Sequence, residues 1–164
     1  MSAELSSTQR VERALREHNL PCRVVELPTS ARTAREAADS IGCQVAQIVK
    51  SLVFRASTSD RPIMVVASGA NRVDEQRLSE LVGEPIARAS PAFVRTHTSF
   101  AIGGVAPLGH PAPLQTYIDR DLLHYDEIWA AAGTPNTVFA LTPRDLQTIT
   151  GGQIVDIRQA DPAA

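Results

Sequence analysis

The sequence predicts a single mixed α/β domain with a sheet of about seven strands and flanking helices. Short apolar runs rich in branched residues, typical of strands, alternate with amphipathic segments that begin at capping residues. Glycine and proline separate these segments, and no internal repeat or linker interrupts them. The length of 164 residues, with 43% hydrophobic and 21% charged residues, suits one globular domain with a sizeable core.

The helices are predicted from one-sided apolar spacing and from start and stop signals. In residues 8–19, Val11 and Leu15 share one face, and a proline follows as a stop signal. Thr33 and Glu36 have the spacing of a capping box. Later helices begin at a capping residue, two of them with proline in the first turn, and end at glycine. The predicted helical segments are 8–19, 33–42, 74–82, one starting at 90–91, a helical turn at 120–125, and one from 142 to 151.

The strands are predicted from apolar runs bounded by turn residues. The predicted strands are 22–27, 48–56, 62–67, 114–119, 127–132, 137–141 and 153–157. The first two are joined through a helix, as in a crossover connection. The second and third suit a hairpin, as do the fifth and sixth around the turn at 133–136. We expect residues 1–158 to form the domain and residues 159–164 to be a disordered tail.

Charge and cysteine usage restrict the function classes. The formal net charge of −2 excludes a protein that binds polyanions through bulk positive charge, but not one that grips a nucleic acid at one end by a few contacts. No apolar run of 18 residues predicts a membrane span, and residues 1–10 lack the apolar core of a signal peptide. Cys22 and Cys43 match no metal or redox spacing, so we interpret them as reduced cysteines of a cytoplasmic protein.

Two features indicate a ligand site. Glycine lets a backbone approach a ligand closely and proline stiffens a loop, and one short segment combines three glycines with a proline and a histidine: Gly103-Gly104-Val105-Ala106-Pro107-Leu108-Gly109-His110. Lys50 is the only charge in the apolar run 48–54. A glycine and proline loop together with an isolated lysine suggests a site for an anionic or carbonyl-bearing ligand.

Other polar residues keep two interpretations each. His110 either binds a terminal nucleotide or aids proton transfer, or it is an exposed loop histidine. The segment Ser68-Gly69-Ala70-Asn71 lies between a strand and a helix and could contact phosphate or ribose through backbone amides, although it is no P-loop. Thr134 beside Gly133 could contact an amino acid or a ribose, or simply form a β-turn. Trp129 is predicted to lie in the core.

No metal or other cofactor is expected. The acidic residues Asp119, Asp121 and Asp126 fit turns and helix caps better than a ligand set for a cation. The sequence also lacks a Gly-x-Ser-x-Gly elbow and a convincing Cys/His arrangement, so no protein nucleophile is predicted.

The order of these segments resembles the YbaK-type aminoacyl-tRNA deacylases, which are related to the editing domain inserted in bacterial prolyl-tRNA synthetases. The resemblance covers roughly residues 11–157 and combines a lysine on an apolar strand with a Gly-x-x-x-Pro loop. The segments that carry it are Val49-Lys50-Ser51-Leu52-Val53-Phe54, Val66-Ala67-Ser68-Gly69-Ala70-Asn71-Arg72-Val73-Asp74, Gly103-Gly104-Val105-Ala106-Pro107, Tyr117-Ile118-Asp119, Ala131-Ala132-Gly133-Thr134 and Leu141-Thr142-Pro143-Arg144-Asp145-Leu146.

The resemblance implies hydrolysis of the ester that joins a wrong amino acid to tRNA, on a partly barrel-like version of the predicted sheet. It implies that Lys50 is essential and that the loop from Gly103 through Gly104 to Pro107 acts in catalysis, with Val105 and Ala106 shaping the pocket. A ribose hydroxyl of the terminal adenosine, or the substrate's own side chain, would then help hydrolysis. The expected partner is the acceptor end of an aminoacyl-tRNA, and a synthetase is a further candidate partner.

The chemistry is consistent with this implication. An aminoacyl ester is already activated, so hydrolysis needs a positioned water and stabilisation of the oxyanion, which backbone N–H groups of a glycine loop can provide. A methylene is worth only about 1–3 kcal/mol in an apolar pocket, so synthetases confuse small amino acids and need a second, size-limited site. The expected substrate is tRNA for proline carrying a small amino acid such as alanine or cysteine.

Two other functions stay open at this point. The same fold could bind an aminoacyl or nucleotide group without chemistry, as a regulatory or synthetase-associated module. It could also be a small-molecule esterase, which would cleave free amino-acid esters as fast as aminoacyl-tRNA. For tRNA contacts, the candidates by position near the site loops are Arg32, Arg35, Arg72 and Arg95.

Overall fold

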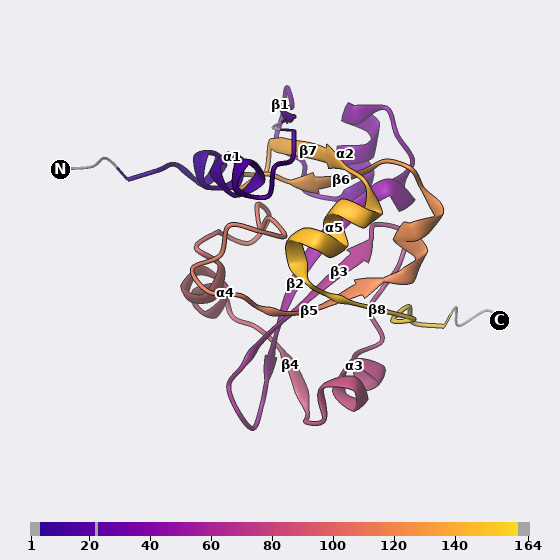
Figure 1. Ribbon diagram of the computed structural model, residues 1–164. Helices are drawn as coiled ribbons and strands as arrows, with labels where there is room; N and C mark the ends of the chain where they lie inside the picture. The colour runs from indigo at the N-terminus through magenta and orange to yellow at the C-terminus, as the bar shows by residue number, and fades with distance from the viewer. Residues whose placement is uncertain (1–3, 22, 161–164) are drawn as a thin grey trace.

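The computed structural model describes residues 4–21 and 23–160, which form one eight-stranded mixed sheet with helices packed around it (Figure 1). The strand order is β1-β7-β6-β2-β3-β5-β8, and β4 pairs with β2 away from this path. The strands are β1 (Val24–Glu26), β2 (Ile48–Ala56), β3 (Pro62–Ser68), β4 (Ile86–Arg88), β5 (Gln115–Asp119), β6 (Ile128–Ala131), β7 (Thr137–Leu141) and β8 (Gln153–Val155). The predicted mixed α/β class is therefore confirmed.

The helices begin and end close to the predicted positions because their capping signals are used. Ser6, Thr33, Asp74, Ser90 and Thr142 each accept a hydrogen bond from a backbone N–H in the first turn. The helices are α1 (Ser7–Glu17), α2 (Ala34–Ile41), α3 (Glu75–Val82), α4 (Pro91–Thr98) and α5 (Pro143–Thr150), with 3-10 turns η1 (Val45–Gln47) and η2 (Arg120–His124). None of the helices in the described ranges is long and apolar enough to cross a membrane.

The hairpin of β2 and β3 is the centre of the sheet. Strand β3 is apolar on both faces: Met64 and Val66 pack into a core beneath α1 and α4, and Ile63, Val65 and Ala67 pack into a second core on the face of α3. The two strands pair in antiparallel register along seven residues of each. Side chains that alternate along β2 therefore reach opposite faces of the sheet.

The other edge of β2 is paired only at its two ends. Strand β6 runs parallel to it at Ile48 and Val49, and β4 runs antiparallel to it from Phe54 to Ala56. Among the described residues, no strand pairs with the middle of β2 on this edge. The unpaired middle of β2, between β6 and β4, is the gap in the sheet.

The structure differs from the predicted fold in two details. The strand β4 was missed, because a segment of three residues with only one side chain facing the core carries almost no apolar period. The predicted crossover is present, since the pairings of β1 with β7, β7 with β6 and β6 with β2 make β1 parallel to β2. Two other strands, however, lie between β1 and β2.

The predicted tail begins in ordered structure. Arg158 forms a β-bridge with Val73, and the backbone N–H of Gln159 donates to the carbonyl of Arg72. Residues 161–164, the rest of the predicted disordered tail, lie outside the described residues, as does Cys22. In the described residues the pairing path is open, running from β1 at one end to β8 at the other.

Gly133 and Gly83 form a matched pair that tests how tightly α1 packs on the β6–β7 turn. Both have a positive φ, +102° and +88°, which costs a substituted alanine about 1–2 kcal/mol. A Cβ on Gly133 would also lie 2.7 Å from the backbone carbon of Ser7, whereas a Cβ on Gly83 would meet nothing within 4 Å.

We therefore expect Gly133→Ala to lower the free energy of unfolding by at least about 2 kcal/mol more than Gly83→Ala, because backbone cannot yield as a flexible side chain can. Urea unfolding at one temperature measures both variants. Equal losses would show that α1 is not packed against the turn.

Candidate active site

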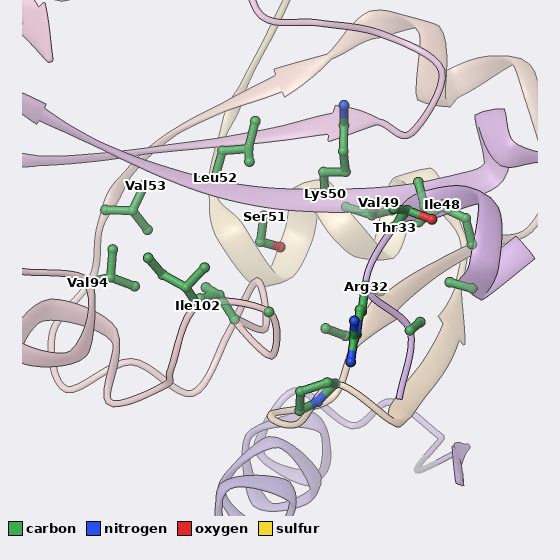
Figure 2. A pocket seen from close by; sticks show the side chains of 18 of the residues that line it. Arg32, Thr33, Ile48, Val49, Lys50, Ser51, Leu52, Val53, Val94 and Ile102 are labelled. Carbon is green, nitrogen blue, oxygen red and sulfur yellow. The ribbon is translucent and has the colours of Figure 1, made fainter. Parts of the chain in front are cut away.

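A cavity of about 930 Å³ lies at the gap in β2 and wraps around its open edge (Figure 2). Its volume is typical of a small-molecule site. The walls come from β2, the segment before α2, the β6–β7 turn, the loop after α4 and the segments next to β4 and α3. The lining residues include Arg32, Ile48, Val49, Lys50, Ser51, Leu52, Val53, Arg72, Val73, Arg88, Val94, Ile102, Gly103, Val105, Trp129, Ala130, Thr134, Pro135 and Thr137.

Lys50 and Ser51 stand on opposite faces of β2, as strand alternation requires (Figure 2). Lys50 projects on the same side as Leu52, which packs into the core beneath α3. Ser51 projects on the same side as Val53, toward Val94 and Ile102. The cavity therefore reaches both faces of the sheet, with Lys50 on one face and a largely apolar compartment on the other, where the side chain of Arg32 also lies.

The ammonium group of Lys50 is held by the turn after β3. Its Nζ donates to the carbonyl of Asn71 at 2.5 Å. Burial lowers the pKa of Lys50 below its usual 10.5, and the nearby charge of Arg72 lowers it further, while Asp119 acts in the opposite direction. Lys50 therefore gives up its proton more easily than a solvated lysine.

The buried carboxylate of Asp119 fixes that turn. Its Oδ2 accepts from the backbone N–H of Ser68 at 3.0 Å and from the side-chain amide of Asn71 at 2.9 Å, and its Oδ1 accepts from the backbone N–H of Asp121. The same Asn71 amide donates to Asp121 at 2.8 Å. Asp119 was predicted to serve a turn or a cap, and it does both.

The glycine loop lies on the apolar side of the cavity. Gly103 lines the cavity, and Gly104 packs so closely on the β6–β7 turn that a Cβ would lie 2.8 Å from the carbonyl oxygen of Gly133 and from the Cα of Thr134. The N–H of Gly104 donates to the carbonyl of Ala101 at 3.0 Å, so it is not available to an oxyanion. The loop shapes the wall rather than presenting this donor.

The predicted site residues fall into three groups. Four line the cavity: Lys50, Gly103, Val105 and Thr134. Seven support its walls from behind: Ser68, Gly69, Asn71, Gly104, Ala106, Pro107 and Gly133. Within the described residues, the segment 68–71 reaches Lys50 through the backbone carbonyl of Asn71, which accepts from its Nζ.

His110 is not brought to this cavity. Its Nε2 lies 2.8 Å from the carbonyl oxygen of Ala106, and its ring meets Phe100 edge-on, beside a separate shallow hollow near Arg10. Burial lowers the pKa of His110, which favours the neutral ring. The loop folds back after Pro107 and carries the histidine away, which its sequence position next to the glycines could not reveal.

Sequence reasoning missed Ser51, Ile102 and Arg88, and misplaced Trp129. The hydroxyl oxygen of Ser51 is buried and has no hydrogen-bond partner in the described chain, and Ile102 is 58% exposed at the cavity. Trp129, predicted for the core, is half-buried and lines the cavity. Ser51 had a usable signal, since it and Lys50 are the two polar residues in the otherwise apolar run 48–54.

Other chemistry finds little support in the described residues. They contain no group of three or more His, Cys, Asp or Glu side chains that could hold a metal ion. Cys43 is a free cysteine, and burial raises the pKa of its thiol, which disfavours the reactive thiolate.

Comparison with known proteins gives the family. Residues 29–149 match the model of the aminoacyl-tRNA editing domain. The chain belongs to this family. A solved structure described as "Crystal structure of a putative trans-editing enzyme for prolyl tRNA synthetase" is 46% identical to this editing domain, with a TM-score of 0.90 over 96% of this chain and 100% of that one.

Two curated relatives extend the comparison. "Uncharacterized protein YwhH" of Bacillus subtilis (strain 168) is 32% identical over 80% of this chain and 83% of its own length. "Putative Cys-tRNA(Pro)/Cys-tRNA(Cys) deacylase EbsC" of Enterococcus faecalis (strain ATCC 700802 / V583) is 25% identical over 92% and 94%. The resemblance inferred from the lysine and the glycine loop is confirmed at the level of the family.

The titration of Lys50 tests the lysine side of the cavity in this editing domain directly. Lys50 is the only lysine in the chain, so its Cε and Nζ give a single side-chain NMR signal. We expect its midpoint below 10.5, and we expect Arg72→Gln to move the midpoint upward because a neighbouring positive charge is removed.

The matched control is Arg144→Gln, an exposed arginine on α5 that does not line the cavity, which should leave the midpoint unchanged. A wild-type midpoint at or above 10.5 would show that the ammonium group is solvated and would contradict the described burial.

Proposed function

We propose that this editing domain is a trans-editing deacylase that hydrolyses the ester of a mischarged tRNA. The observation that carries the proposal is the two-sided cavity, which joins a half-buried lysine to a largely apolar compartment in a chain of the editing family. The names of the relatives as deacylases or as a trans-editing enzyme support hydrolysis. A non-catalytic binding module of the same fold becomes an outcome of the test below.

The two compartments suit the two halves of an aminoacyl-adenosine. The apolar side, between Val94, Val105 and Thr134, accepts a small uncharged acyl group. The cationic side, with Lys50 and Arg72, suits the phosphate that precedes the terminal ribose.

Hydrolysis in this arrangement needs no protein nucleophile. The ester is activated, and the site contributes by fixing it in place and by limiting the water that reaches it. In the proposed mechanism a ribose hydroxyl of the substrate assists the attacking water. Lys50 acts by binding and orienting the nucleotide, because its ammonium group projects from the face of β2 opposite the acyl compartment.

The proposed substrate is tRNA for proline carrying alanine or cysteine. This choice is supported by two relatives, of which one is named for prolyl-tRNA synthetase and another for Cys-tRNA(Pro). The proposed partner is the acceptor end of the tRNA, and a synthetase is the second candidate partner. The proposed compartment is the cytoplasm. A synthetase distinguishes amino acids that differ by one methylene by only about 1–3 kcal/mol, and such a second site removes the wrong amino acids that it attaches.

Hydrolysis of an aminoacyl-tRNA panel tests the proposal. tRNA for proline is charged with alanine, cysteine, serine and proline, and wild type is compared with Lys50→Ala and with Lys50→Met, which keeps an apolar stem without the charge. We expect selective loss of one non-proline ester by wild type and at least a hundredfold slower hydrolysis by both variants, about 3 kcal/mol, since a charge-assisted contact is removed.

Circular dichroism confirms that the variants remain folded. Full activity of folded Lys50→Ala would contradict the role of the lysine. Binding of aminoacyl-tRNA without hydrolysis at any protein concentration would replace the deacylase with the binding module, and equally fast cleavage of free amino-acid esters would indicate a general esterase.

The arginines at the cavity predict a shallow salt dependence of tRNA binding. Arg32, Arg72 and Arg88 line the cavity, and Arg35 and Arg95 do not. Three phosphates of a single strand would give a slope of about −2 for log K against log salt concentration. Arg72→Gln should reduce the slope by about 0.7, whereas Arg144→Gln should not change it. A much steeper wild-type slope would reveal a further basic face.

A further inference from the structure

The open edge of β2 presents main-chain hydrogen-bonding groups to the cavity. The hairpin sets which residues face this edge: the N–H of Gly69 donates to the carbonyl of Ile48, and the N–H of Ala56 donates to the carbonyl of Arg61. Hydrogen-bonded pairs recur every second residue in an antiparallel ladder. Lys50, Leu52 and the other even-numbered residues of β2 therefore bond to β3.

The odd-numbered residues of β2 point the other way. The N–H of Ser57, just beyond β2, donates to the carbonyl of Pro85 next to β4, which confirms the alternation. Val49 meets β6 and Arg55 meets β4. Between them, the backbone N–H and C=O groups of Ser51 and Val53 face the gap, and among the described residues no strand pairs with them there.

A second observation places a ligand at the same edge. The hydroxyl of Ser51 is buried and has no partner within the described ranges, although a buried hydroxyl without a hydrogen bond is costly. It lies on the cavity side of the strand, next to the free main-chain groups (Figure 2). A bound molecule with polar groups at this edge would supply hydrogen-bond partners for the hydroxyl and for the main-chain N–H and C=O groups.

The order of donors and acceptors selects the kind of group that binds. The two N–H groups are two residues apart, about 6–7 Å along the strand, so they cannot converge on a single oxyanion. The carbonyl of Ser51 lies between them and would repel it. A carbonyl beside an N–H instead matches the edge of adenine, where the N6 amino group donates and a ring nitrogen accepts.

The cavity walls suit a flat base in the plane of the sheet. Such a base would hydrogen-bond to the edge of β2 as a neighbouring strand does. Its two flat faces would then be turned toward the side chains above and below the sheet. Leu52 lies on one side of β2, and Val53 with Ile102 lies on the other (Figure 2). Ile102 is 58% exposed, so its side chain is accessible to one face of such a base.

We propose that the main-chain edge of Ser51 and Val53 reads the adenine of the terminal tRNA nucleotide, with the carbonyl of Ser51 accepting from N6 and the N–H of Val53 donating to a ring nitrogen. The identity of the ligand rests on the proposed function. The placement also orders the substrate: the base fills the gap in β2, with the phosphate toward Lys50 and the acyl group toward Gly103.

Three non-hydrolysable ligands test the base contact with the full chain. They are 3′-alanylamino-3′-deoxyadenosine and its counterparts with unsubstituted purine, which lacks the amino group, and with hypoxanthine, whose O6 would face the carbonyl of Ser51. Calorimetric titration should show binding about tenfold or more weaker for each counterpart, because a main-chain group loses its partner.

Main-chain NMR locates the contact independently. The amide proton of Val53 should move downfield when the adenosine ligand saturates the protein, because its N–H then donates to a ring nitrogen. Val53→Pro removes this donor and Val53→Ile keeps it, so only the proline variant, if folded, should bind the adenosine ligand more weakly, while the carbonyl of Ser51 still distinguishes the three ligands. If Val53→Pro does not fold, the ligand series and the amide shift still decide.

The outcomes separate the base contact from the deacylase function. Equal affinity for the three ligands, alongside hydrolysis of mischarged tRNA, would overturn the base contact and leave the function intact. Discrimination among the ligands without hydrolysis would support the contact while contradicting the deacylase. If the protein binds none of the three ligands and hydrolyses no mischarged tRNA, both the base contact and the deacylase function are overturned.

Discussion

Strand β2 is fully paired on one edge and only at its ends on the other, and the site depends on this interrupted pairing. If β6 and β4 met, they would cover the backbone of Ser51 and Val53 and close the cavity. They stop short because β6 ends at Ala131, before the turn into β7, and β4 ends at Arg88, just before Ser90 caps α4. The gap is therefore a consequence of topology and needs no mobile loop.

The buried carboxylate of Asp119 connects this gap to the rest of the sheet. It ends β5, accepts from the end of β3 and from Asn71, and so fixes the carbonyl that holds Lys50. A buried carboxylate is retained where its hydrogen bonds are complete, and here three donors surround it. The position of the lysine charge thus follows from contacts that begin two strands away.

The sequence was sufficient for the elements and for the key polar position, but not for the arrangement of the site. Capping residues such as Thr33 and Asp74 act locally, so helix bounds follow from them directly. Lys50 stood out because a charge on a buried strand is costly. The separation of Lys50 from the glycine loop by the sheet, and of His110 from both, depends on long-range pairing and on how a loop turns back, for which local patterns carry no signal.

The two-sided cavity explains how an essential lysine and a discriminating apolar pocket can coexist in the proposed function. A charge inside the acyl compartment would favour polar side chains and blunt a selection that rests on about 1–3 kcal/mol per methylene. With Lys50 on the other face of β2, its charge is assigned to the nucleotide in the proposed function, and the acyl group is assigned to the side lined by Val94, Val105 and Gly103. Substrates that differ only in the amino acid share the contacts of Lys50 with the nucleotide, so in this proposal the difference in rate among them arises on the acyl side of the cavity.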